Sequence, residues 1–318
     1  MSGVFNLKTI FGNDSIKFNK YSTAVGLGNF DGLHVGHMVL INAVINEARM
    51  NGLESVVYTF TRHPENVIRK NLFTPLLTTV DKRMQLLGET RLDHAWFDEF
   101  DEEYSRMEPE DFVRDILAER LGARVAVAGF NYRFGHRGRG NSEMLKELGE
   151  KHGIRVIIIP AVRIGPEIVS STAIREHILK GDMEKAAVLL GRHYSIMGKV
   201  LDGKRVGRKI GFPTANLRPE DYLALPGNGV YLTKTLYDGV LYDSLTNVGI
   251  NPTFGGAASV SVETHILGFE KDIYEDDIEV FFLKKLRDEI RFGSAGELSV
   301  QIDRDIKAAK EYFGPASP

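Results

Sequence analysis

Hydrophobic and polar residues follow two different patterns along this chain, one in each half. In the first half, short apolar runs alternate with segments in which apolar residues recur at helical spacing. The apolar runs predict strands at residues 22–30, 53–60, 123–130 and 153–160. The amphipathic segments predict helices at residues 37–52, 109–122 and 142–153. This alternation predicts a parallel, Rossmann-like α/β sheet with helices on both faces, as in nucleotide-binding domains.

From Tyr194 onward the pattern changes to one strand after another. Asp202-Gly203 and Asp238-Gly239 are dipeptides typical of β-hairpin turns. Further strands are predicted at residues 229–237, 240–249, 260–269 and 278–286, followed by a helix at 297–313. Strands at such regular spacing predict a small, closed antiparallel β-barrel with a C-terminal helix packed on it.

Between the two patterns, residues 171–191 predict two short helices that close the first domain. No internal repeat and no low-complexity linker separates the halves. We therefore predict two tightly joined domains of ordinary size, residues 1–186 and 187–318.

Composition narrows the class of protein. The 318 residues are 43% hydrophobic and 26% charged, with a formal net charge of -3. No overall basic field favours a nucleic-acid or membrane partner. Cysteine is absent, which excludes disulfides, thiolate catalysis and cysteine zinc sites. The N-terminus shows no signal peptide, and the longest apolar runs are strand-sized. The sequence favours a cytoplasmic protein, and it does not predict the oligomeric state.

Residues 28–37, GNFDGLHVGH, lie between a predicted strand and a predicted helix. Glycines let the backbone approach an anion, and a helix N-terminus directs unpaired N–H groups toward it. An ordinary turn with incidental histidines is one alternative, and a metal pair is another, although no third ligand is evident. Two histidines and three glycines within these ten residues favour phosphate binding. The candidate residues are Gly28, Asn29, Phe30, Asp31, His34, Gly36 and His37.

A later segment, SSTAIR at residues 170–175, offers a second set of phosphate donors at a helix start. Ser171 and Thr172 are also typical N-cap residues, and Arg175 is also a plausible surface residue. Both interpretations are compatible, because a cap and a phosphate donor occupy the same end of a helix.

Two strand ends add candidates for binding a flat ligand. TFTRHP at residues 59–64 places His63 at the ligand edge of the sheet. GFNYRFGHRGRG at residues 129–140 interleaves aromatic residues with arginines around Asn131. RNA binding by stacking and phosphate contact is an alternative for this segment. The near-neutral net charge disfavours RNA, so a loop that holds a flat aromatic ligand explains it better.

The second candidate site is the glycine-rich basic segment at residues 198–217. A hairpin with a solvated basic turn is one interpretation, and a loop that folds over phosphates is the other. Within PTAN, Thr214 and Asn216 supply two oxygen ligands on one face of an extended segment, which suits Mg²⁺ held with ATP phosphates. The candidate ATP-binding residues are Gly198, Gly203, Lys204, Gly207, Gly211 and Pro213. Glu263 is a carboxylate in an otherwise apolar strand, and an outward, solvated glutamate is its simpler interpretation.

Together these motifs resemble the two modules of the bacterial bifunctional riboflavin kinase/FAD synthetases. GNFDGLHVGH, TFTRHP, GFNYRFG and SSTAIR are similar to the nucleotidyltransferase module, and GFPTANL, PGNGVY, NVGINPTF and the ETH strand to the kinase module. The resemblance implies that His34 and His37 contact ATP phosphates in a site with Ser171, Thr172 and Arg175. It also implies that Asn131, where many relatives carry Asp, helps to hold the flavin.

For the kinase module, the resemblance implies a Mg²⁺–ATP site at Thr214 and Asn216 and a general base at Glu263. The expected activities are phosphorylation of riboflavin to FMN and adenylylation of FMN to FAD, each with ATP. One alternative is an enzyme that retains a single activity. Another is a non-catalytic flavin-binding regulator, which would have lost His34, His37 or Glu263.

Overall fold

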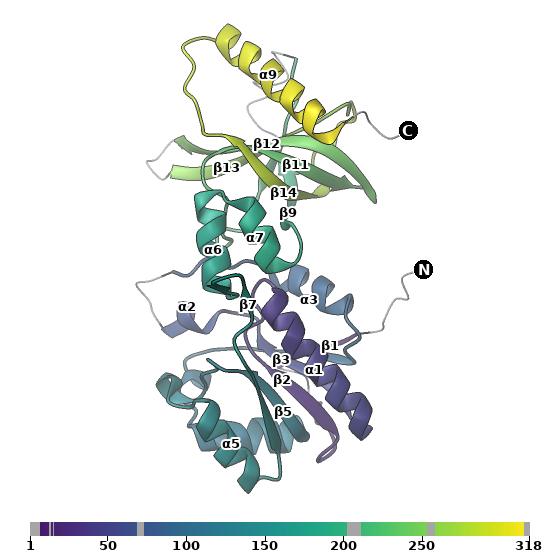
Figure 1. Cartoon of the computed structure of the whole chain (residues 1–318), viewed down its shortest axis with the longest axis vertical. Coiled ribbons are helices and arrows are strands. Elements are labelled where there is room, and N and C mark those ends of the chain that lie inside the picture. The colour runs from purple at the N-terminus through teal and green to yellow at the C-terminus, as the bar shows by residue number, and fades with distance from the viewer. Residues whose placement is uncertain are drawn as a thin grey trace. The chain divides into compact units, whose positions relative to one another are not determined.

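The computed structural model describes residues 7–12, 14, 16–68, 73–201, 211–252 and 258–314. Contacts within the chain define two compact units, residues 1–171 and 172–318. Figure 1 shows that the first unit is an α/β structure and that the second is built around a β-barrel.

The first unit is built on six parallel strands in the order β1-β4-β3-β2-β5-β6. The strands are β1 (Lys8–Phe11), β2 (Thr23–Leu27), β3 (Glu54–Phe60), β4 (His94–Asp98), β5 (Ala123–Gly129) and β6 (Arg155–Ile159). The strand order reverses at β2, because β3 lies on one side of it and β5 on the other. Ligands of open parallel sheets bind at the carboxyl ends of the strands beside such a reversal.

Helices cover both faces of this sheet. α1 (Val35–Asn51) and α3 (Val80–Gly88) pack against one face, whose core includes Val57 of β3. A helical segment at residues 109–120 and α5 (Ser142–Lys151) pack against the other face, whose core includes Val56 and Tyr58. The remaining short elements are α2 (Pro64–Ile68), η1 (Tyr104–Arg106), η3 (His136–Gly138), β7 (Arg163–Ile164) and β8 (Glu167–Ile168).

Most of the elements predicted for this unit are confirmed, within a few residues at their ends. The predicted helix at 109–122 begins as α4 (Pro109–Asp111) and continues as a π-helix, η2 (Phe112–Arg120). The sequence pattern does not predict β1, β4 or α3. All five residues of β4 are buried, so this strand lacks the alternation that marks a half-buried strand.

The second unit contains a closed barrel in the order β10-β13-β12-β11-β14-β9, and all its strand pairs are antiparallel. The strands are β9 (Tyr194–Leu201), β10 (Ala215–Arg218), β11 (Gly229–Tyr237), β12 (Val240–Pro252), β13 (Ala258–Ile266) and β14 (Asp277–Arg287). The C-terminal helix α9 (Ala295–Phe313) packs on the outside of the barrel through a core that includes Val230, Leu245 and Ala309. The predicted barrel and helix are therefore confirmed.

A tight turn and a row of buried hydroxyl groups define the register of the barrel strands. Asp238 and Gly239 form the two-residue turn between β11 and β12 with φ values of 50° and 74°, the left-handed pair that a tight hairpin requires. The other predicted hairpin, at residues 202 and 203, lies outside the described residues. Inside the barrel, the fully buried hydroxyls of Thr233, Thr246 and Thr264 form a row with O–O distances of 2.8 and 2.9 Å. This row ties β11, β12 and β13 together.

Two helices precede the barrel, α6 (Ser171–Lys180) and α7 (Met183–Leu190). α7 packs against β14 and β9, and Glu184 forms an ion pair with Lys284. The turn at Gly181 lies against the Tyr231 hydroxyl, which a side chain at position 181 would meet at 2.6 Å. Residues 172–190 thus pack as part of the barrel unit, and the domain boundary after residue 186 stays a prediction.

Candidate active sites

The segment GNFDGLHVGH forms the connection between β2 and α1, at the carboxyl end of the sheet and beside the reversal of strand order. Its backbone is unusual, because Phe30 and Leu33 have φ values of 48° and 36°, and Gly32 has 84°. Residues other than glycine rarely occupy this left-handed region, and such strain concentrates at ligand sites. Phe30 and Leu33 are nevertheless buried, so the surrounding structure holds the loop in this form.

His34 and His37 lie together at the start of α1. Their rings stack with centroids 3.5 Å apart and planes inclined by 12°. His34 is the N-cap residue, and its Nδ1 accepts a hydrogen bond from the backbone N–H of His37 at 3.1 Å. Because Nδ1 is an acceptor, the proton of neutral His34 resides on Nε2, which can then donate. A side chain at Gly36 would meet the His34 ring at 3.2 Å, so glycine makes room for the stack.

The Asp31 side chain binds residues outside the loop instead of lying with the two histidines. Its buried carboxylate accepts hydrogen bonds from the backbone N–H groups of Leu77 and Thr78 and from the Thr78 hydroxyl, at 2.9 to 3.2 Å. Its carbonyl oxygen accepts from the Ser171 hydroxyl at 2.9 Å. The Asp31 side chain therefore anchors the loop from behind, and Ser171 connects the start of α6 to the same loop.

The other residues predicted for this site are placed as follows. Thr172 is exposed and Arg175 is 8% exposed, both on α6 in the second unit, and their approach to the histidines stays a prediction. His63 follows β3 and accepts a hydrogen bond at Nδ1 from the Glu65 N–H at 3.3 Å. Asn131 is exposed just after β5, next to Phe130, whose side chain is also exposed. His63 and Asn131 therefore both lie at the carboxyl edge of the sheet, and their contact with a flat ligand stays a prediction.

A buried polar network that no sequence pattern predicts lies at this edge of the sheet. The Tyr58 hydroxyl on β3 donates to Asp98 Oδ2 at the end of β4 at 2.5 Å, and Tyr104 lies 2.9 Å from the same hydroxyl. Arg120 donates to the same carboxylate oxygen at 3.3 Å. Burial raises the pKa of Tyr58 well above its ordinary value, and the neighbouring Tyr104 and Asp98 add to the rise. The residues of this network are not spaced in a regular way along the sequence, so only the fold brings them together.

Arg83 on α3 is a second group that the sequence did not reveal. Its guanidinium is buried at the ends of β2 and β3, where Nη1 donates to the carbonyl oxygens of Asn29 and Phe60 at 3.1 and 2.8 Å. Thr59 donates to the same Asn29 carbonyl at 2.9 Å. A single arginine in an amphipathic segment is usually exposed, so the sequence does not predict that Arg83 is buried against the Asn29 and Phe60 carbonyls.

In the barrel, strand register brings the predicted kinase residues together. Asn216 of β10 pairs with Glu263 of β13, and Glu263 in turn pairs with Asn247 of β12. Directly paired residues lie on the same face of a sheet with Cβ atoms roughly 5 Å apart. Glu263 is half-buried, between the fully buried Val262 and Thr264 that face the barrel interior. Three polar side chains from three strands therefore form one row on the outer face.

Two contacts extend this row. The imidazole of His265 donates from Nδ1 to the Pro213 carbonyl at 2.7 Å, which fixes the segment before β10 against β13. A side chain at Gly249 would meet Glu289 Oε1 at 2.7 Å and Asn247 Nδ2 at 3.4 Å. A second carboxylate, Glu289, thus lies beside the row. The sequence did not single out Asn247 or Glu289.

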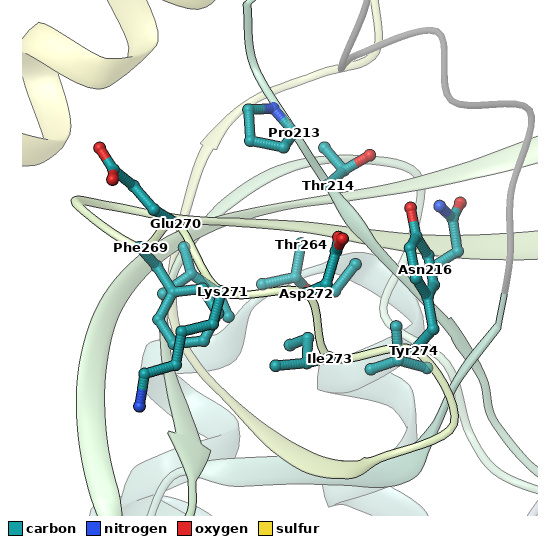
Figure 2. A pocket seen from close by; sticks show the side chains of 13 residues that line it. Pro213, Thr214, Asn216, Thr264, Phe269, Glu270, Lys271, Asp272, Ile273 and Tyr274 are labelled. Carbon is teal, nitrogen blue, oxygen red and sulfur yellow. The ribbon is translucent and has the colours of Figure 1, made fainter.

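A pocket opens next to this row at one end of the barrel (Figure 2). Pro213, Thr214 and Asn216 line one side, and the segment from Phe269 to Tyr274 lines the other. Figure 2 shows the Asp272 carboxylate in the middle of the pocket, whereas the amine of Lys271 points away from it. The cavity volume is about 140 Å³. Ligand pockets commonly measure about 300–1,000 Å³, so a nucleotide here would extend beyond this lining.

The glycines predicted to bind kinase ATP are only partly described. Gly198 lies in β9, where a side chain would meet the Arg218 carbonyl at 3.1 Å, and Gly211 precedes PTAN with a φ of 90°. Gly203, Lys204 and Gly207 lie outside the described residues. Within the described ranges, no group of three or more His, Cys, Asp or Glu side chains could hold a metal ion by itself. A metal held by Thr214 and Asn216 would need further ligands from a phosphate.

Comparisons with known proteins match this division into two sites. Residues 16–173 match the family model described as FAD synthetase, and residues 190–313 match the one described as riboflavin kinase. Bifunctional riboflavin kinase/FMN adenylyltransferases from Buchnera aphidicola (subsp. Schizaphis graminum), Haemophilus influenzae and Escherichia coli K12 are 34%, 33% and 32% identical to this chain. These alignments cover 96%, 91% and 92% of this chain and 99%, 94% and 93% of those proteins.

A solved structure also resembles the chain along most of its length. It is described as a macrolide-efflux protein from Streptococcus pneumoniae, is 30% identical, and covers 95% of this chain and 98% of its own with a TM-score of 0.85. The described part of the present chain has no helix long and apolar enough to cross a membrane. The two family models and the full-length relatives agree in finding one module of each kind in the same chain. This chain belongs to the bifunctional riboflavin kinase/FMN adenylyltransferase family.

Proposed function

We propose that the chain makes FAD from riboflavin in two steps, with the kinase step at the barrel row and the adenylyl step at the β2–α1 loop. The observation that carries the proposal is that each unit has its own site suited to one step. The stacked His34 and His37 lie at a helix start, and Asn216 and Glu263 are paired on two strands. In-line transfer between two bound substrates requires positioning and charge stabilisation and no covalent intermediate.

In the kinase step, the terminal ribityl hydroxyl of riboflavin attacks the γ-phosphorus of ATP. The new O–P bond forms as the bond from the γ-phosphorus to the β–γ bridging oxygen breaks, giving FMN and ADP. Glu263 accepts the hydroxyl proton and orients the hydroxyl. Glu263 is half-buried, which limits its solvation, and its pairing with Asn216 lies beside the proposed phosphate site.

Thr214 and Asn216 fit a divalent ion, for which we propose Mg²⁺. Both offer neutral oxygens beside the pocket, and an ion of this kind usually takes one or two protein ligands and completes its shell with phosphate and water. When bound, it would neutralise charge on the transferred phosphoryl group. Pro213 fixes the approach of this segment through its hydrogen bond to His265. Gly198, Gly203, Lys204, Gly207 and Gly211 remain candidates for the loop over the phosphates.

In the adenylyl step, a phosphate oxygen of FMN attacks the α-phosphorus of ATP. A new P–O bond forms as the bond from the α-phosphorus to the α–β bridging oxygen breaks, giving FAD and pyrophosphate, and no proton transfer is required. His34 Nε2–H and the His37 imidazole are the proposed donors to the phosphate oxygens. The backbone from Gly28 to Gly36 would approach the phosphates with its N–H groups.

The remaining candidates complete this proposal. Ser171, Thr172 and Arg175 would add donors to the phosphates. His63 and Asn131 would lie along the flavin, because they follow β3 and β5, the strands on either side of β2. Asn29, Phe30 and Asp31 act mainly through the loop backbone, since the Asp31 carboxylate already accepts hydrogen bonds from Leu77 and Thr78.

The deciding experiment follows both products with time. Purified protein is incubated with riboflavin, ATP and Mg²⁺, and FMN and FAD are separated chromatographically. FMN should appear first and FAD should follow, and FMN supplied directly should give FAD without a lag. Formation of FMN alone or conversion of supplied FMN alone would establish a single-activity enzyme. Tight flavin binding with neither product would establish a regulator. Replacing Mg²⁺ with a chelator should abolish the kinase step.

A further inference from the structure

Arg83 contacts the β2–α1 loop, although it lies in a distant part of the chain. It lies on α3, more than forty residues after the loop, and is only 3% exposed. Its Nη1 donates to the Asn29 carbonyl at 3.1 Å, to the Thr59 hydroxyl at 3.3 Å and to the Phe60 carbonyl at 2.8 Å. One guanidinium thus joins the loop after β2 to the end of β3.

Leu77 and Thr78, just before α3, hold the loop at a second point. The backbone N–H groups of Leu77 and Thr78 donate to the Asp31 carboxylate, and the Thr78 hydroxyl accepts from the Gly32 N–H at 3.1 Å. The two anchors, at Asn29 and at Asp31 and Gly32, lie on either side of Phe30. We call Leu77, Thr78 and Arg83, which supply these hydrogen bonds, the clamp segment.

The clamp segment meets a specific need of this loop. Phe30 and Leu33 adopt left-handed backbone conformations that side chains other than glycine avoid. Such conformations persist only where the surroundings over-determine them. Without the hydrogen bonds to Asn29 and Asp31, the loop would relax and the direction of its N–H groups would change.

We propose that Arg83 is a positioning residue for adenylyl transfer and that it acts through the Asn29 carbonyl. That carbonyl and the Phe30 N–H belong to one peptide group, so donation by a permanent cation also polarises this N–H toward an anion. Arginine suits the role because it stays charged when buried, and its Nη1 alone serves three acceptors here. The inference rests on the proposed function of residues 28–37 as the ATP phosphate site.

The test compares four variants of the full-length chain. Arg83→Met removes the charge, Arg83→Lys keeps a charge but lacks the fork, and Thr59→Val removes the second donor to Asn29. Lys82→Met is the matched control, because Lys82 is a buried cation on the same helix whose ammonium donates to Gln85 on that helix. For each variant, kcat and KM for FMN and for ATP are measured in FAD formation. The emission of Trp96, the only tryptophan and a buried residue of β4, reports folding of the first unit during urea unfolding.

Arg83→Met should lower kcat for FAD formation by about 10²-fold with little change in either KM, because small displacements of a positioned site act mainly on the transition state. Arg83→Lys should recover part of that kcat, Thr59→Val should lose less than Arg83→Met, and Lys82→Met should match the parent. If Arg83→Met does not fold, Arg83→Lys and Thr59→Val decide the matter. Unchanged kcat in the folded variants overturns the inference. A loss of kcat in all four variants that parallels a decrease in their unfolding midpoints also overturns the inference.

Failure of this inference is distinguishable from failure of the proposed function. His34→Ala is measured in the same assay. If His34→Ala abolishes FAD formation and the folded Arg83 variants do not reduce kcat, the loop is the ATP site and Arg83 is a purely structural arginine. If His34→Ala also retains full activity, the phosphate site itself has been placed wrongly.

Discussion

The two sites are assembled in different ways. In the α/β unit, the proposed phosphate site is one continuous stretch, residues 28–37, and His34 and His37 lie together at the start of one helix. In the barrel, Asn216, Glu263 and Asn247 come from three strands and meet only through register. The first site depends on a strained backbone, whereas the second depends on regular antiparallel pairing that carries no such strain at these positions.

This difference determines what each site needs from the rest of its unit. A strained loop must be held from outside, and residues 77–83 supply hydrogen bonds to Asn29 and Asp31. A row across a sheet is held by the strands themselves, and here the buried Thr246 and Thr264 hydroxyls add a direct tie between β12 and β13. The loop should therefore be sensitive to distant substitutions, and the row should be sensitive mainly to its own residues.

The largest effect is expected for His34→Ala. The variant removes a donor that the cap geometry orients, so FAD formation from FMN should fall on the order of 10²–10³-fold, the usual cost of one preorganised donor. FMN formation by the barrel should be nearly unchanged. The two rates are measured separately, with riboflavin or with FMN as the substrate.

A parallel measurement on His37→Ala sharpens this test. His37 lies within the stack but does not cap the helix with its side chain, so the loss of activity should come without the loss of the cap. Equal loss of both activities in either variant would mean that the histidines support folding of the chain instead of one chemical step.

Next in size is the effect of Glu263→Gln on the kinase step. Glutamine keeps the shape and one acceptor oxygen but cannot take up a proton, so kcat for riboflavin phosphorylation should fall roughly 10²-fold. Riboflavin and ATP should still bind, and FAD formation from supplied FMN should persist. Glu289→Gln is the matched control, since Glu289 lies beside Asn247 but outside the paired row. A near-normal rate in Glu263→Gln would make Glu263 a solvated strand residue.

Sequence alone predicted the contiguous features well. The β2–α1 loop, the Asp238-Gly239 hairpin and the two fold types each follow from local pattern, because turns and amphipathic elements are encoded within a few residues. Arg83 and the Tyr58–Asp98 pair could not be predicted, since their partners are distant in sequence and no spacing links them. The Glu263 row is intermediate: the sequence points to Asn216 and Glu263 singly and not to Asn247, and only the register shows that the three are neighbours.

The third prediction concerns the boundary between the units. A fragment of residues 187–318 should phosphorylate riboflavin and make no FAD, as expected for an autonomous barrel. It removes α6 and the start of α7, including Met183, a buried residue of a helix that packs on β14 and β9. A fragment of residues 172–318 keeps these contacts and should unfold at least about 5 °C higher, since a few kcal/mol shift a small domain by that much. Equal midpoints by circular dichroism would place the boundary at 186.

The smallest expected effect is on the unfolding free energy of the first unit at alkaline pH, where Tyr58 of the buried network ionises. Burial holds the pKa of Tyr58 above its ordinary value near 10, so the hydroxyl stays protonated in the folded unit at a pH where the unfolded chain ionises it. The folded state then binds more protons than the unfolded state. Its stability is therefore fully present below pH 10 and is lost above it, by about 1.4 kcal/mol per pH unit for one group.

Tyr58→Phe removes this group, so its unfolding free energy should fall less steeply above pH 10 than that of the parent. The variant should be less stable than the parent at pH 8, because Asp98 loses the donor at 2.5 Å. Urea unfolding followed by Trp96 emission between pH 8 and 11 measures both quantities in the first unit alone. Parallel curves for the two proteins would show that Tyr58 ionises as readily in the folded unit as in the unfolded chain.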